Sequence, residues 1–76
     1  MYEVWLIRKH NGDGSYSYYS HCTGIGGFPE WVSGHNSRET AKHFKTQEQA
    51  EKVLREISVY LLGKKTDIIS AKVRSL

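Results

Sequence analysis

The sequence has a single cysteine, a single proline and no long apolar segment. Cys22 alone cannot form an internal disulfide, and without a second cysteine there is no zinc knuckle. No stretch approaches the roughly 18 consecutive apolar residues of a membrane-spanning helix, and Met1 is not followed by a basic leader with a long apolar run. The sequence therefore predicts a cytoplasmic protein that does not enter a membrane.

With 76 residues and a mass of 8.7 kDa, the chain has room for one small domain, spanning residues 1–76. Its core would be modest, without a cavity large enough for a cofactor. Domains of this size often gain stability from disulfides, metals or association. Since the first two are not indicated, we favour a homodimer. The formal net charge of +3 comes from residues 63–76, which hold four basic residues and one acidic residue.

The strongest local signal is an amphipathic helix in the second half of the chain. Thr46 and Gln49 have the spacing of a capping box, in which the threonine oxygen accepts a backbone N–H and the glutamine reaches back. Apolar residues then recur at steps of three and four. This stripe consists of Ala50, Val53, Leu54, Ile57, Tyr60 and Leu61. Because Gly63 can take the left-handed conformation that ends a helix, the pattern predicts a helix over about residues 47–62.

A β-hairpin is predicted at the start of the chain. Residues 2–10 and 15–22 are rich in strand-forming side chains, and the Asn-Gly-Asp-Gly segment between them is typical of a tight turn. Closing the loop symmetrically places Ile7 opposite Tyr18, and side chains then alternate between two faces. One face carries Tyr2, Val4, Leu6, Arg8, Tyr19 and His21, and the other carries Trp5, Ile7, Lys9, Tyr16, Tyr18 and Cys22.

The remaining segments predict further elements around the helix. Residues 23–37 are rich in glycine, with a short strand at residues 31–33, and residues 36–44 indicate a single helical turn. The inward side chains of that turn would be Ala41 and Phe44, and a last half-buried strand is marked by Ile69, Ala71 and Val73. The predicted fold class is α+β, a small antiparallel sheet packed on one helix in the order ββ(β)αβ.

The sequence leaves open which face of the hairpin the helix covers. If it packs on the Val4 face, aromatic side chains interleaved with cations remain on the other. This expected aromatic platform consists of Trp5, Lys9, Tyr16 and Tyr18, flanked by Lys72 and Arg74 from the last strand. Such a surface stacks single-stranded bases, at about 1–3 kcal/mol per base, or binds a protein. The alternative is that residues 23–37 cover Trp5 and Tyr18 as a second small core.

No catalytic or metal-binding pattern is present. The four histidines, at spacings of 11, 14 and 8 residues, match no compact ligand set. His21 and Cys22 are adjacent and would point to opposite faces of a strand, so a nucleophilic Cys–His pair would need a distant partner, His35 or His43. We therefore expect no enzyme, no metal and no cofactor, with the histidines at the surface.

The hairpin is followed by an Ala-x-x-Phe-x-Thr-x-x-x-Ala-x-x-x-Leu stretch, formed by Ala41, Phe44, Thr46, Ala50 and Leu54. In this arrangement the chain resembles small phage and prophage proteins of uncharacterised role. The resemblance implies a compact α+β domain encoded among accessory genes, many of which act by binding a host or phage protein. It transfers no active-site residue.

These observations predict a non-catalytic binding module, an accessory or inhibitor protein that engages a protein partner through the aromatic sheet face or an edge strand. The modest net charge of +3 favours this hypothesis. The alternative is single-stranded nucleic-acid binding, with the phosphates neutralised by Lys9, Lys64, Lys65, Lys72 and Arg74. A steep loss of affinity with salt would distinguish the alternative, because each neutralised phosphate releases counterions.

Overall fold

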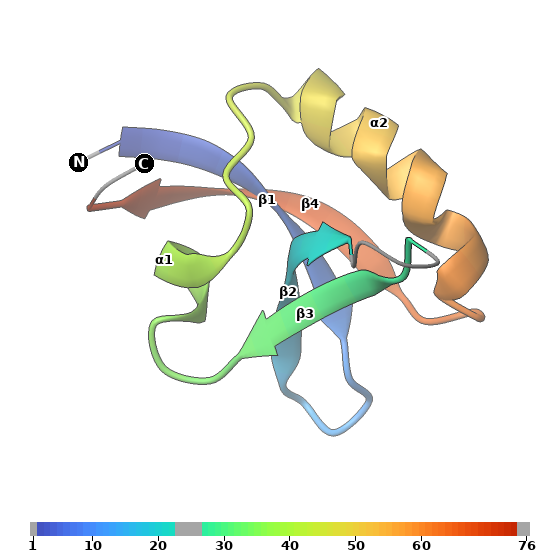
Figure 1. The fold of residues 1–76 in the computed structure, drawn as a ribbon. Coiled ribbons are helices and arrows are strands. Elements are labelled where there is room, and N and C mark those ends of the chain that lie inside the picture. Colours follow the sequence, from blue (N-terminus) through green and yellow to red (C-terminus); the bar gives the residue numbers. More distant parts are fainter. Residues whose placement is uncertain (1, 23–26, 75–76) are drawn as a thin grey trace.

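The computed structural model, which describes residues 2–22 and 27–74, has an antiparallel four-stranded sheet with two helical segments (Figure 1). The strand order across the sheet is β3-β2-β1-β4. This arrangement confirms the predicted α+β class and the third strand. In chain order the elements are β1 (Tyr2–His10), β2 (Tyr16–Cys22), β3 (Pro29–Ser33), α1 (Ser37–Thr40), α2 (Gln47–Ile57), the 3-10 turn η1 (Ser58–Tyr60) and β4 (Thr66–Val73).

The long helix begins where the capping box predicts. The Thr46 hydroxyl oxygen accepts from the Gln49 N–H at 3.2 Å, while the Gln49 side chain accepts from the N–H of Lys45, also at 3.2 Å. The glutamine thus reaches one residue further back than a capping box requires. Helix α2 ends at Ile57 and continues as η1, so the helical segment is shorter than predicted, although Gly63 has the expected positive φ of 83°.

The predicted register of the hairpin is wrong by one residue. Arg8, rather than Ile7, lies opposite Tyr18. The loop is odd in length, because the Asp13 carboxylate accepts from both the N–H and the hydroxyl of Ser15, at 2.9 and 2.6 Å, and Asn11 pairs with Ser15 across it. Since side chains alternate, this shift moves every β2 side chain to the opposite face. Tyr19 therefore shares a face with Trp5, whereas Tyr18 does not.

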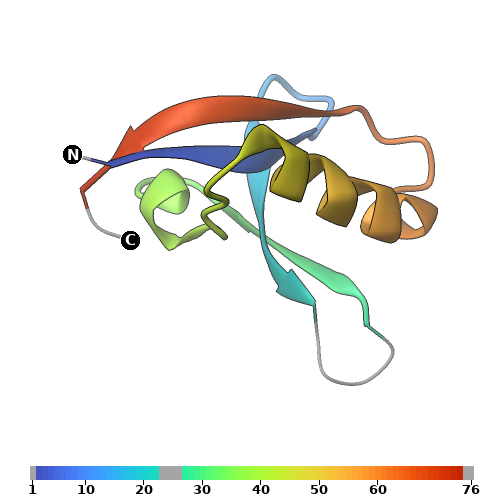
Figure 2. The ribbon, with the colours of Figure 1, turned by 90° about the horizontal axis from the view of Figure 1, so that it is seen from above.

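Strands β1 and β2 separate beyond the Arg8–Tyr18 pair, and a loop fills the fork between them. The N–H and C=O of Trp5 bond to the backbone of Phe44 at 2.9 and 3.0 Å, and the Lys42 N–H bonds to the C=O of Tyr19 at 2.8 Å. Figure 2 shows the β2–β3 pair leaving the direction of β1 and β4 at a steep angle, with α2 lying in the angle between them. The loop thus satisfies backbone groups that the separation of the strands would leave unpaired.

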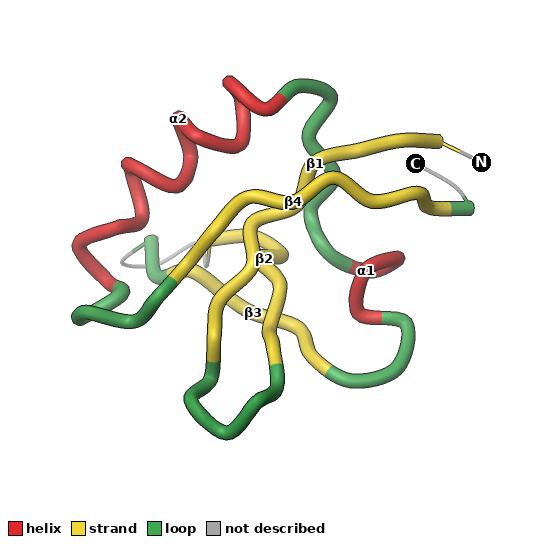
Figure 3. The backbone as a smooth tube through the Cα atoms, turned by 180° about the vertical axis from the view of Figure 1, so that it is seen from behind, coloured by secondary structure: helices red, strands yellow, loops and turns green. Residues whose placement is uncertain are grey.

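Two small cores lie on opposite faces of β1. Its neighbouring residues Leu6 and Ile7 are both fully buried, each at 0% exposure, which contributes about 1.5–3 kcal/mol per side chain. One core is formed by Val4, Leu6, Tyr18, Ala41, Ala71 and Val73, and the other by Ile7, Tyr19, Phe44, Ala50 and Ile57. Helix α2 belongs to the second core and α1 lies beside the first, so the helices flank β1 from different sides (Figure 3).

The expected aromatic platform does not form. Trp5 is half-buried against the α2 core, while Tyr18 is buried in the core on the other face. The cause is the one-residue register shift together with the packing of α2 on the Trp5 face. The alternative was that residues 23–37 cover Trp5 and Tyr18 as a second small core, and residues 23–26 of that segment lie outside the described residues. None of the helices in the described part of the chain is long and apolar enough to span a membrane.

Candidate binding surfaces

The six residues predicted to bind a partner are divided between two regions. Tyr16, Tyr18 and Lys72 line one pocket, and the backbone N–H of Arg74 bonds to a residue of the same pocket. Lys9 lies on the face that α2 covers, with its ammonium 4.6 Å from the ring centre of Trp31, and Trp5 packs against the same core. The structure therefore brings together three of the six and separates them from Trp5 and Lys9.

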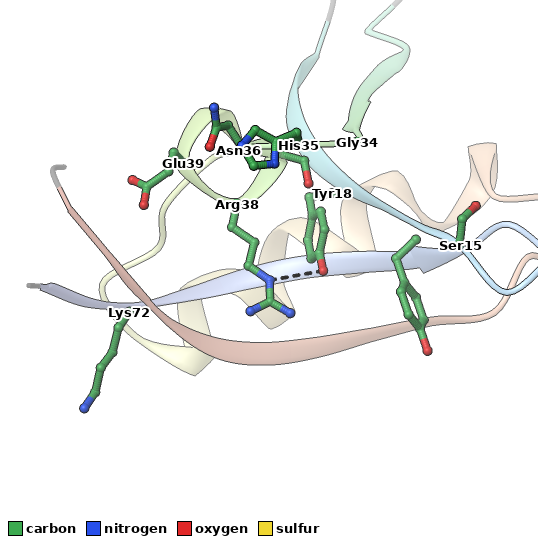
Figure 4. Close-up of a pocket in the computed structure, with 10 residues that line it drawn as sticks. Ser15, Tyr18, Gly34, His35, Asn36, Arg38, Glu39 and Lys72 are labelled. Atoms are coloured by element: carbon green, nitrogen blue, oxygen red, sulfur yellow. Dashed lines mark hydrogen bonds between the residues drawn. The ribbon is translucent and has the colours of Figure 1, made fainter.

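The pocket lies between the start of β2 and the short helix α1, and it is open to solvent (Figure 4). It has a volume of about 500 Å³. The lining residues that carry aromatic or charged groups are Tyr16, Tyr18, His35, Arg38, Glu39 and Lys72. Sequence reasoning missed the contribution of α1, because its residues have no distinctive spacing and reach the pocket only through the tertiary fold.

The charged groups of this pocket come from α1 and β4. The Arg38 guanidinium donates to the Tyr18 hydroxyl at 3.4 Å, and within residues 2–22 and 27–74 neither Arg38 nor Lys72 forms an ion pair with a carboxylate. Both oxygens of Glu39, the acidic residue among the described lining residues, accept from the backbone N–H of Arg74, at 3.2 and 3.1 Å. The Lys72 side chain lies on the sheet face of Glu3 and is directed away from Arg38 (Figure 4), so the pocket presents one guanidinium and one engaged carboxylate.

A polar cluster fixes the Tyr16 ring at one end of the pocket. Arg8 forms a two-point hydrogen bond with Asp67, at 2.9 and 2.7 Å, and its guanidinium carbon lies 4.4 Å from the ring centre of Tyr16. His10 contacts the edge of the same ring, with centroids 4.9 Å apart. The hydrogen bonds from Arg8, and then that of His10, hold the pKa of Asp67 below its usual value.

A second surface lies where η1 and the turn before β4 meet the residue that precedes β3. It consists of apolar side chains that remain exposed: Phe28 (58% exposed), Val59 (70%), Tyr60 (37%) and Leu62 (90%). We call these four residues the apolar tip. The Phe28 and Tyr60 rings meet edge to face, with centroids 5.0 Å apart. Tyr60 was predicted to face the core with Leu61, but only Leu61 is buried.

The backbone at the apolar tip is in an unusual conformation. The N–H of Lys64 bonds to the C=O of Leu61 at 2.9 Å, and the two residues between them, Leu62 and Gly63, have φ angles of 50° and 83°. A turn with positive φ at both central positions favours Asn-Gly, because a bulky L-residue is disfavoured there. Leu62 thus has both a conformation and an exposure that leucine normally avoids.

Two lysines lie close to one another beside this turn. Partial burial lowers the pKa of Lys9, and the nearby charge of Lys64 lowers it further. Neither ammonium forms an ion pair with a carboxylate of the described residues. Lys64 closes the turn that holds Leu62, and its charge acts on Lys9, so both cations lie close to the apolar tip.

The cysteine and histidines take part in local contacts. The Cys22 sulfur lies 3.2 Å from the hydroxyl of Tyr19, and burial, followed by this hydrogen bond, raises the pKa of Tyr19 to about 12. His21 lies 3.6 Å from a carboxylate oxygen of Glu30, and His43 contacts the C=O of Arg38 at 2.9 Å. In the described ranges no three His, Cys, Asp or Glu side chains form a group that could hold a metal ion.

Comparisons with known proteins return no relative. No family model matches the chain, and neither the curated proteins nor the solved structures contain a match. The two surfaces must therefore be interpreted from their own chemistry. The resemblance to phage accessory proteins stays a prediction.

Proposed function

We propose that the protein is a non-catalytic binding module that uses the apolar tip to engage an acidic segment of another protein. The observation that carries this proposal is Leu62, a residue that is 90% exposed and has a backbone φ of 50°. An exposed leucine in a strained turn contributes little to folding. Exposed apolar patches and local strain both favour a role in recognition.

The composition of the apolar tip supports a protein partner. Two aromatic rings, Phe28 and Tyr60, contact each other, and Val59 and Leu62, close to Tyr60 in the sequence, are also exposed. Aromatic side chains are enriched at interfaces because they bury a large area with little loss of conformational entropy. A patch of this kind provides the buried centre of a small interface, with Lys64 at its rim.

The charges support an acidic partner rather than a second copy of this chain. A two-fold dimer formed through the apolar tip would bring like surfaces together, including the Lys9 and Lys64 ammonium groups of both copies. The chain also carries a net charge of +3. A segment with Asp or Glu beside apolar residues would instead pair with the lysines and speed association. The homodimer becomes an outcome that the test below detects.

The proposal keeps the role of an accessory or inhibitor protein but places contact at the apolar tip instead of an aromatic sheet face. Its test is selection of a random 12-residue displayed peptide library on the protein, followed by titration of the enriched peptides into labelled protein. We expect peptides that combine Asp or Glu with Leu or aromatic residues, with amide shifts centred on residues 58–64 and Phe28. Two lost anchors would weaken affinity by at least about tenfold, since each tenfold corresponds to about 1.4 kcal/mol.

The matched variants separate the surface from the fold. Val59→Ser combined with Leu62→Asn should lose binding, while Tyr2→Ser, which also removes an exposed apolar side chain, should keep it. Enrichment of peptides that bind the double variant equally well would refute the proposal. So would selection of no peptide at all, or a sedimentation measurement showing a dimer that Val59→Ser with Leu62→Asn dissociates.

A further inference from the structure

We propose that the outer edge of β4 pairs with the β4 strand of a second copy of the chain, so that two sheets join about a two-fold axis. This interaction goes beyond the proposed peptide binding, because no residue of the apolar tip belongs to β4. In the strand order β3-β2-β1-β4, β4 is an edge strand that pairs with β1. Figure 2 shows β4 along one border of the molecule, with both helices on its β1 side.

The direction of the backbone groups of β4 follows from the bonds of β1. The N–H and C=O of Trp5 bond to Phe44, which lies on the β2 side of β1. Since Trp5 lies opposite Ser70, the N–H and C=O of Ser70 point away from β1. Alternation gives the same outward direction to the backbone groups of Thr66, Ile68 and Lys72. Within residues 2–22 and 27–74, none of these outward groups is hydrogen-bonded.

The free part of this edge is centred on Ile69. Arg74 is the next outward residue after Lys72, and its N–H is already bonded to both carboxylate oxygens of Glu39, at 3.2 and 3.1 Å. The side chain of Glu39 therefore closes the edge at the end of β4. The free outward residues extend from Thr66 to Lys72, and Ile69 is their midpoint.

An antiparallel pairing centred on Ile69 is self-complementary. It places Ile68 of each copy opposite Ser70 of the other, and Thr66 of each copy opposite Lys72 of the other. Each free outward N–H and C=O thereby gains a partner. The two Ile69 residues meet at the axis as a non-hydrogen-bonded pair, the arrangement in which facing side chains lie closest.

Two neighbouring isoleucines leave both cores incompletely covered at this edge. Ile69 is half-buried against the core that contains Leu6, and Ile68 is half-buried against the core under α2. A strand beside β4 would cover the exposed parts of both side chains, one on each face of the sheet. Association of this kind adds apolar burial, which domains of this size have in short supply.

The charges of β4 favour a second copy over an acidic segment. The strand contains one acidic and one basic residue, Asp67 and Lys72, and Asp67 is already bonded to Arg8. In the proposed pairing Asp67 faces Ala71, and Lys72 faces Thr66, so no like charges lie opposite each other. The two Lys72 residues lie about 20 Å apart, at about 3.4 Å per residue, which exceeds the Debye length of about 8 Å at physiological salt.

The other edge of the sheet is protected against such pairing. Strand β3 has five residues, begins with Pro29, and pairs with β2 through a register shift between Tyr19 and His21. Short strands, prolines and bulges each hinder pairing with another chain. Strand β4 has eight residues, no proline and a continuous register with β1. Lysine also protects edges, but Lys72 lies at the end of the free segment rather than at its centre.

The test combines sedimentation equilibrium of the full chain, at concentrations up to about 1 mM, with hydrogen exchange of its backbone amides. We expect a concentration-dependent dimer in which the amides of Ile68, Ser70 and Lys72 exchange slowly, although they have no acceptor within the described part of one copy. In a dimer of isotope-labelled and unlabelled chains, filtered nuclear Overhauser spectra should show contacts between the Ile69 methyl groups of the two copies.

Ser70→Pro removes an outward N–H without breaking a bond within the copy, and edge strands tolerate proline at such positions. It should weaken dimerisation by at least about tenfold, because the two-fold axis doubles the loss of one hydrogen bond. Ser70→Thr keeps the N–H and is the matched control, and it should leave the dimer unchanged. Thermal melts verify that each variant folds, and hydrogen exchange of the unaltered chain tests the pairing without any variant.

A chain that stays monomeric at every concentration would overturn the proposal. So would a dimer in which the Ser70 amide exchanges rapidly, or one that a folded Ser70→Pro variant leaves intact. A dimer that Val59→Ser with Leu62→Asn dissociates would place the contact at the apolar tip and refute this proposal. If the β4 amides of a monomer become protected only when a peptide from the library selection is added, the edge binds that peptide and not a second copy.

Discussion

Replacing Leu62 with asparagine should make the protein more stable while removing an anchor of the proposed interface. Leu62 and Gly63 are the central residues of a turn closed by the Lys64–Leu61 hydrogen bond, and both have positive φ. A left-handed conformation costs an L-residue about 1–2 kcal/mol. Asparagine bears less of this cost because its short polar side chain bonds locally, and Asn-Gly is the preferred pair for such turns.

The magnitude follows from the exposure of the leucine. Leu62 is 90% exposed as a residue, so loss of its side chain costs about 0.2–0.3 kcal/mol out of the 1.5–3 kcal/mol of a fully buried leucine. Relief of the backbone strain should raise the free energy of unfolding by about 0.5–1 kcal/mol. The net gain is about 0.5 kcal/mol, which corresponds to a rise in Tm of about 2–4 °C in a domain of this size. Urea unfolding should show the midpoint moving up with an unchanged slope.

Leu62→Ala is the control for this measurement, because alanine retains the Cβ and its left-handed cost but loses the side chain. It should be slightly less stable than the wild type, by at most about 0.3 kcal/mol. If Leu62→Asn is instead less stable than Leu62→Ala, the turn is not strained, and if Leu62→Ala loses more than about 0.3 kcal/mol, the leucine packs against the fold. That result would also remove the main support for the apolar tip as a binding surface.

Three further predictions concern the described contacts. Asp67→Asn should be less stable than the wild type at pH 7 by under about 1 kcal/mol, since the carboxylate is partly exposed. Because the pKa of Asp67 is lower in the folded protein than in the unfolded chain, this difference in stability should shrink as the pH falls below about 3.9 and vanish below the folded pKa, as urea unfolding at each pH would show. The pKa of Tyr19 is raised to about 12, so ultraviolet titration should show one tyrosine ionising near that pH, and stability should fall as the pH rises above about 10. Leu6→Ala should cost about 2–5 kcal/mol on denaturant unfolding, whereas a loss below about 1 kcal/mol would contradict its complete burial.

The features that the sequence predicts well are those set by neighbouring residues. The start of α2 depends on Thr46 and Gln49, three residues apart, and the turn after η1 on Gly63. The alternating last strand is likewise confirmed as β4. Each of these signals acts within about one turn of the chain, so no knowledge of the tertiary fold is required.

The arrangement of the candidate site residues depends on long-range contacts, and there the predicted hairpin register was wrong. An even and an odd hairpin loop both fit Asn-Gly-Asp-Gly, and the choice depends on the bonds between Asp13 and Ser15. That one-residue difference decides whether Tyr18 or Tyr19 shares a face with Trp5. The contribution of Arg38 and the exposure of Leu62 likewise arise only when α1 and η1 are placed against the sheet.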